Sequence, residues 1–91
     1  MKAQKFKRGD LVRIAKDLGA SMAHFEADQD AIVMGSYRDL CGSGPNNTKE
    51  YEVLLCKNGD SHSWYYERQL TFIKHVGEDA ITALKDKYNT W

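Results

Sequence analysis

Three consecutive aromatic residues, Trp64, Tyr65 and Tyr66, are the side chains best suited to recognition. In a strand, neighbouring side chains point to opposite faces, so Trp64 and Tyr66 share one face and Tyr65 takes the other. If one face is the core, at least one large ring lies outside it. Aromatic and arginine side chains are typical anchors of protein–protein contacts. We therefore predict a partner-binding site formed by Tyr37, Arg38, Tyr51, Trp64, Tyr65 and Arg68. The alternative is that Trp64 and Tyr66 simply fill a small core, where aromatic rings dominate the energetics.

The basic residues are concentrated near the N-terminus. Lys5, Lys7, Arg8 and Arg13 could form a strip that contacts the phosphates of a nucleic acid or nucleotide. The chain carries 13 basic and 13 acidic residues, and this zero net charge counts against a dedicated nucleic-acid binder. The alternative is a solvated strand edge whose charges discourage pairing with other chains.

Catalytic, metal and cofactor motifs are missing from the sequence. The histidines and the cysteines Cys41 and Cys56 do not fall at close ligand spacing. No residue pattern places a base beside Cys41, and Gly42-Ser43-Gly44 lacks the Lys-Ser/Thr ending of a P-loop. The sequence therefore predicts a protein that is not an enzyme and has no metal site and no cofactor.

The N-terminal residues contain no apolar stretch, and no run approaches the roughly 20 apolar residues of a membrane span. Two cysteines are fewer than small secreted domains usually carry. We expect a cytoplasmic protein with free thiols and no membrane partner.

Period-two alternation predicts short strands over residues 10–15, 31–37, 50–56, 61–66 and 70–73, with a single turn at 67–69. The apolar residues 31–34 indicate a strand covered on both faces. Asn58-Gly59 suits a tight type I′ hairpin turn. Residues 21–27 fit either one helical turn capped by Ser21 or a loop pinned by Phe25.

The C-terminal residues predict an amphipathic helix that begins after Gly77, with Val76 and Ile81 closing as a hydrophobic staple. Its apolar stripe either packs on the sheet or mediates assembly with a second copy of the chain. The residues predicted for such assembly are Ile81, Leu84, Tyr88 and Trp91.

Residues 6–14, with Gly9-Asp10 leading into an alternating strand, and residues 63–73 together resemble SH3-like barrel domains. The resemblance is to KOW-type, Agenet-like and MIB/HERC2-like modules, and to small bacterial and phage proteins that pair a Gly-Asp first strand with a late Ser-Trp-Tyr segment. It implies a mainly β domain, a small five-stranded SH3-like barrel over residues 1–76, with a C-terminal α-helix over residues 77–91. For function, we expect a non-catalytic protein-interaction module, an adaptor or a small inhibitor of a host or partner protein. The alternative is a nucleic-acid or nucleotide-binding accessory protein that uses the basic first strand.

Overall fold

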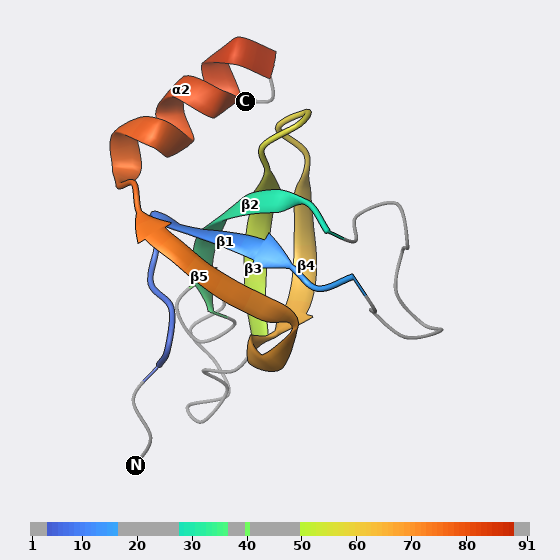
Figure 1. The fold of residues 1–91 in the computed structure, drawn as a ribbon. Coiled ribbons are helices and arrows are strands. Elements are labelled where there is room, and N and C mark those ends of the chain that lie inside the picture. The colour runs from blue at the N-terminus through green and yellow to red at the C-terminus, as the bar shows by residue number, and fades with distance from the viewer. Residues whose placement is uncertain (1–3, 17–27, 37–39, 41–49, 89–91) are drawn as a thin grey trace.

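Five strands and a C-terminal helix make up the computed structural model, which describes residues 4–16, 28–36, 40 and 50–88 (Figure 1). The strands are β1 (Asp10–Ile14), β2 (Asp30–Ser36), β3 (Glu50–Leu55), β4 (Ser61–Tyr66) and β5 (Leu70–His75). A 3₁₀ turn, η2 (Glu67–Gln69), joins β4 to β5, and the helix α2 spans Glu78–Tyr88. The prediction of a mainly β chain with one C-terminal helix is confirmed.

All strand pairs are antiparallel, in the order β4-β3-β2-β1-β5. The sheet curls into a half-barrel (Figure 1). Register shifts interrupt the β1–β5, β2–β3 and β3–β4 pairs. Such irregularities bend a strand and increase its twist, which helps a short sheet to curl around its own core.

The sheet carries apolar side chains on both faces. Alternation along β1 sends Val12 and Ile14 into the inner core, whereas Leu11 faces the outer side. Along β2, Ala31 and Val33 belong to the inner core, and their neighbours pack on the outer side, so the predicted two-sided burial of residues 31–34 is confirmed. The inner core comprises Phe6, Val12, Ile14, Ala31, Val33, Tyr51, Val53, Leu55, Tyr65 and Leu70.

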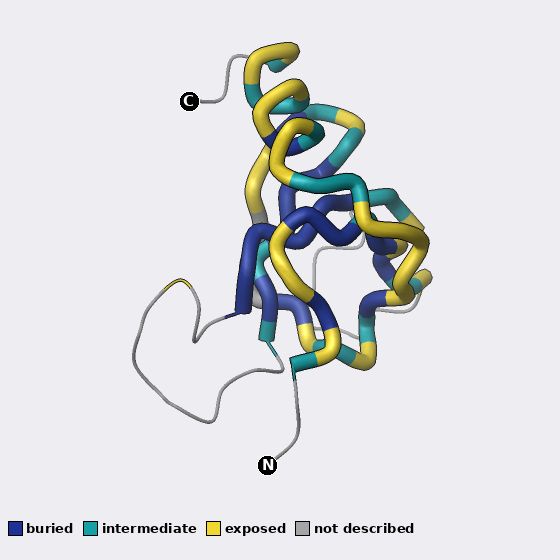
Figure 2. Tube along the Cα trace, turned by 90° about the vertical axis from the view of Figure 1, so that its left-hand side faces the viewer, coloured by how far each residue is buried: buried dark blue, intermediate teal, exposed yellow. Residues whose placement is uncertain are grey.

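Helix α2 covers the outer face through one fully buried side chain, Ile81, which packs with Ile32, Met34 and Leu54. Val76 and Leu84 lie against the same cluster, consistent with the predicted staple. The rest of the helix is exposed or half-buried, as Figure 2 shows beside the C-terminus. No helix within residues 4–16, 28–36, 40 and 50–88 is long and apolar enough to cross a bilayer.

The junction between β5 and α2 packs tightly against the start of β1. The carbonyl oxygen of Gly9 accepts hydrogen bonds from the N–H groups of Val76 (2.8 Å) and Gly77 (3.0 Å). Gly9 has φ +92°, and a Cβ there would lie 2.9 Å from the Cα of Gly77. Next to this contact, the buried carboxylate of Asp10 lies 2.8 Å from Nδ1 of His75. The positive φ of residue 9 and its close approach to Gly77 therefore require glycine at that position.

The β3–β4 hairpin differs from its prediction. A type I′ turn requires positive φ at both central residues. Gly59 has φ +74°, but Asn58 does not have positive φ. The loop is longer, because the N–H of Leu55 donates to the carbonyl of Asp60 and the N–H of Gly59 donates to the carbonyl of Leu55. The side-chain oxygen of Asn58 accepts the N–H of Asp60 at 3.0 Å instead. The predicted turn type is wrong, although the hairpin itself is present.

Candidate partner-binding surface

The structure removes two tyrosines from the predicted partner-binding site. Tyr51 is 0% exposed and Tyr65 is 1% exposed, and both rings belong to the inner core. The prediction that they contact a partner is wrong, because both rings are enclosed in the inner core, where large aromatic side chains bury the most apolar surface. Tyr66 instead faces outward and is 41% exposed, so the alternative that placed Tyr66 in the core is also wrong.

Tyr51 has a structural role. Its hydroxyl donates to Oε2 of Glu67 (2.9 Å) and accepts the N–H of Phe6 (3.3 Å). The rings of Phe6 and Tyr51 meet edge to face, 5.3 Å between centroids. Burial, reinforced by the hydrogen bond and the negative charge of Glu67, raises the pKa of Tyr51 to about 12. The hydroxyl therefore remains a proton donor across the physiological range and ties the segment before β1 to η2.

The hydroxyl of Tyr65 is buried and has no hydrogen-bond partner within the part of the chain that the structure describes. Leaving a buried polar group unsatisfied costs about 1–3 kcal/mol. Tyr65→Phe should therefore raise the free energy of unfolding by about 1 kcal/mol, whereas Tyr51→Phe should lower it by about 1 kcal/mol. Urea denaturation of both variants measures the two changes. Equal losses for the two substitutions would show that the Tyr65 hydroxyl is satisfied in solution.

Of the other predicted contact residues, Tyr37 and Arg38 lie outside the described residues, and so does the side chain of Trp64. Arg68 is exposed on η2, with its guanidinium 4.7 Å from the centroid of the Tyr66 ring. This cation–π pair places a guanidinium group and an aromatic ring together on the surface at the end of β4.

Strand β5 carries two of the four exposed large apolar side chains of the described residues, and one of them, Phe72, is the most exposed. Phe72 is 51% exposed and Ile73 is 42% exposed, and every residue from Thr71 to His75 is exposed. We call residues 71–75 the β5 surface. The sequence pattern predicts this segment only as a final strand. Two adjacent large apolar residues were the available signal, since they cannot both face the core of a strand.

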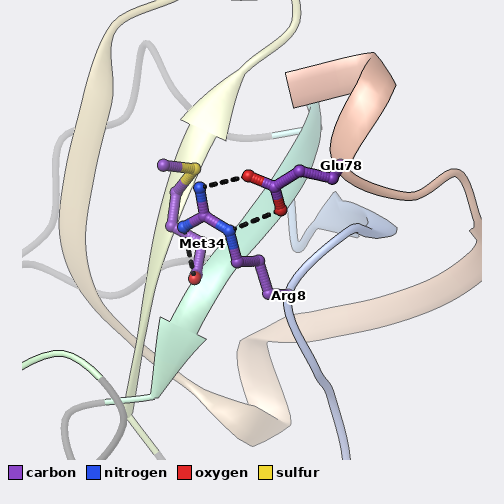
Figure 3. Close-up of polar contacts among 3 residues, drawn as sticks. All are labelled: Arg8, Met34 and Glu78. Atoms are coloured by element: carbon purple, nitrogen blue, oxygen red, sulfur yellow. Dashed lines mark hydrogen bonds and ion pairs between the residues drawn. The ribbon is translucent and has the colours of Figure 1, made fainter. Parts of the chain in front are cut away.

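The basic residues do not form a free strip. Arg8 makes two hydrogen bonds to the carboxylate of Glu78, at 2.7 and 2.8 Å, and a third to the carbonyl of Met34 at 3.2 Å (Figure 3). The hydrogen bond raises the pKa of Arg8 and lowers the pKa of Glu78. The contact fastens the segment before β1 to β2 and to the start of α2.

Arg13 is likewise paired, with Asp30 at 2.5 Å and Asp28 at 3.4 Å, and the Asp30 hydrogen bond raises its pKa. Lys5 and Lys7 are exposed, and Nζ of Lys5 lies 5.3 Å from the centroid of the Phe6 ring. Two of the four predicted phosphate contacts are therefore neutralised by carboxylates. This arrangement weakens the case for a nucleic-acid site.

Of the four residues predicted to mediate assembly through the helix, the structure describes Ile81, Leu84 and Tyr88. Ile81 is buried inside the molecule, so the prediction that it contacts a second copy is wrong for this arrangement of α2. Leu84 packs beside it, and Tyr88 is half-buried. Trp91 lies outside the described residues. The helix uses its apolar stripe on its own sheet.

The described residues include no group of three or more histidine, cysteine or acidic side chains that could hold a metal ion. The thiol of Cys56 is half-buried, and burial together with the charge of Asp30 raises its pKa, which disfavours the reactive thiolate. Cys41 lies outside the described residues.

A hollow of about 310 Å³ lies between α2 and the β3–β4 hairpin. Met34 and Leu54 provide its apolar lining, while Glu52, Asp60 and Lys85 are among its polar residues. Cofactor pockets are lined mainly by apolar side chains, so this hollow is a poor cofactor site. Comparison of the chain with protein-family models, with curated proteins and with solved structures gives no match.

Proposed function

We propose that this chain is a non-catalytic protein-interaction module, an adaptor or a small inhibitor, that contacts its partner through the β5 surface. The observation that carries the proposal is the exposure of Phe72 and Ile73 side by side on an edge strand. Scattered exposed apolar residues are ordinary, but adjacent ones on a strand edge are a liability that proteins usually suppress. An edge of this kind is explained when another protein covers it.

We also propose that the half-barrel belongs to the SH3-like barrels. The strand order β4-β3-β2-β1-β5 and the 3₁₀ turn that links β4 to β5 support this assignment. An interaction role rests on the surface rather than on the barrel, because one fold hosts many functions.

Substitution of Phe72 provides the test. We expect Phe72→Ser to lower the recovery of the physiological partner on immobilised protein by at least about tenfold, as the loss of a central aromatic anchor does. Recovery from native lysate is quantified for each captured protein by mass spectrometry. Leu40→Ser is the matched control, because Leu40 is 42% exposed and lies outside β5.

Thermal unfolding of both variants checks that they remain folded. We expect this because the substituted side chains, Phe72 and Leu40, are exposed. If the double variant Phe72→Ser, Ile73→Ser is folded and captures every protein that the unmodified chain captures, the β5 surface is not the contact site and the proposal fails.

A further inference from the structure

Strand β5 is hydrogen-bonded on one side only. Its register with β1 pairs Leu70 with Ile14, Phe72 with Val12 and Lys74 with Leu11. No described strand pairs with its other side. In a strand with one neighbour, alternate N–H and C=O groups point away from that neighbour and are available to an added strand.

The side chains along this edge are open as well. Residues 71–75 are all exposed, so no segment among the described residues covers them. The β1–β5 register shifts between Leu11 and Val12, and Ile73 has no Cα partner on β1. Phe72 and Ile73, consecutive in the sequence, lie within this exposed stretch. Extended peptides add to sheet edges through main-chain hydrogen bonds and gain specificity from side chains like these.

The charge of the strand indicates the kind of segment that it accepts. Residues 70–75 contain no acidic side chain, and Lys74 is exposed. Arg68 adds a second exposed cation just before the strand. The carboxylate of Asp10 is buried against His75 and the N–H of Lys7, so it does not face an incoming chain. Carboxylates on the incoming segment would therefore find Lys74 and no acidic side chain within residues 70–75.

We propose that β5 accepts an extended segment of a partner protein, one that alternates apolar and acidic residues, as an additional strand. This inference rests on the proposed interaction role and names the kind of partner. Phe72 pairs with Val12 of the inner face and Lys74 with Leu11 of the outer face, so the two side chains lie on opposite faces of the sheet. Apolar side chains of the segment therefore pack on Phe72, its carboxylates lie near Lys74, and its backbone pairs with the free edge of β5.

The probe is a short peptide of alternating valine and glutamate, acetylated and amidated at its ends. We expect amide chemical-shift changes in the ¹⁵N-labelled chain to concentrate at residues 70–75, with a saturable titration. Alternating valine and lysine is the control peptide and should bind more weakly. Lys74→Glu should weaken binding of the acidic peptide by about fivefold, as expected for a cross-strand charge pair, and this difference should shrink in high salt.

Backbone methylation separates strand addition from side-chain contact. Alternate amides of a strand face the same edge, so we prepare two methylated forms of the acidic peptide. In one phase the odd-numbered backbone amides are methylated, and in the other phase the even-numbered ones are. At least one phase should lose affinity by about tenfold or more, since several main-chain hydrogen bonds are removed. If both phases bind as tightly as the parent peptide, strand addition does not occur.

The remaining outcomes are equally decisive. The inference is overturned if the peptide does not bind saturably, or if the chemical-shift changes lie away from β5. It is also overturned if the shifts at β5 change with protein concentration in the absence of peptide, since the occupant is then a second copy of the chain. If Phe72→Ser releases the captured partner while methylation has no effect, the inference is wrong and the proposed function stands. If β5 pairs with the peptide but Phe72→Ser leaves capture unchanged, the proposed function is wrong and the pairing stands.

Discussion

Gly9→Ala is expected to lower the free energy of unfolding by about 3 kcal/mol, because it adds steric overlap to backbone strain. Residue 9 has φ +92°, a conformation that L side chains rarely adopt. The new methyl group would also lie 2.9 Å from the Cα of Gly77, and backbone cannot give way as a flexible side chain can. Equilibrium denaturation in urea, followed by intrinsic fluorescence, measures the loss.

Gly77→Ala is the matched control for this substitution. Gly77 also has a positive φ, +84°, but a Cβ there meets only the ring Nε2 of His75, at 4.0 Å. Gly77→Ala should therefore lower the free energy of unfolding only by the cost of the strained backbone conformation, about 1–2 kcal/mol. Equal losses for Gly9→Ala and Gly77→Ala would mean that the close approach of the two glycines does not contribute to stability in solution.

Ile81→Ala is expected to cost about 3 kcal/mol and to release α2 from the sheet. Ile81 is the one fully buried side chain of the helix, and it fills the space between Ile32, Met34 and Leu54. An eleven-residue helix is marginal by itself in water, so its helicity depends on this packing. The far-UV circular dichroism signal at 222 nm and hydrogen exchange of the amides in 81–88 should report the release before the sheet unfolds.

Thr82→Ala is the control on the same helix. Thr82 is exposed, and alanine has the higher helix propensity, so the change should leave stability within about 0.5 kcal/mol of the unmodified chain. If Ile81→Ala behaves like Thr82→Ala, the helix is not held by its buried side chain.

Much of the β architecture follows from local pattern. The sequence predicts β4 and η2 with their observed bounds, because alternation ends where the turn residues begin. It ends β5 at Ile73, two residues too early. Lys74 and His75 extend the strand because they pair with Leu11 and Asp10, a tertiary contact that local alternation does not encode.

The site was harder to predict than the strands. Alternation shows correctly that Tyr65 and Tyr66 face opposite ways, but not which of them is inside. That choice depends on partners distant in sequence, such as the inner core around Tyr65 and the Arg68 guanidinium over Tyr66. The pairing of Arg8 with Glu78, 70 residues apart, is likewise invisible to local charge patterns, and it removes a cation from the predicted basic strip.

The position of β1 between β2 and β5 has a consequence for synthesis on the ribosome. Strand β1 is translated well before its second neighbour, because β5 begins at Leu70 and the helix that covers the outer face of the sheet follows later still. Contacts of such long range are slow to form. The nascent chain therefore carries an incomplete sheet with apolar residues on both sides, and chaperones can bind it until β5 and α2 have been translated.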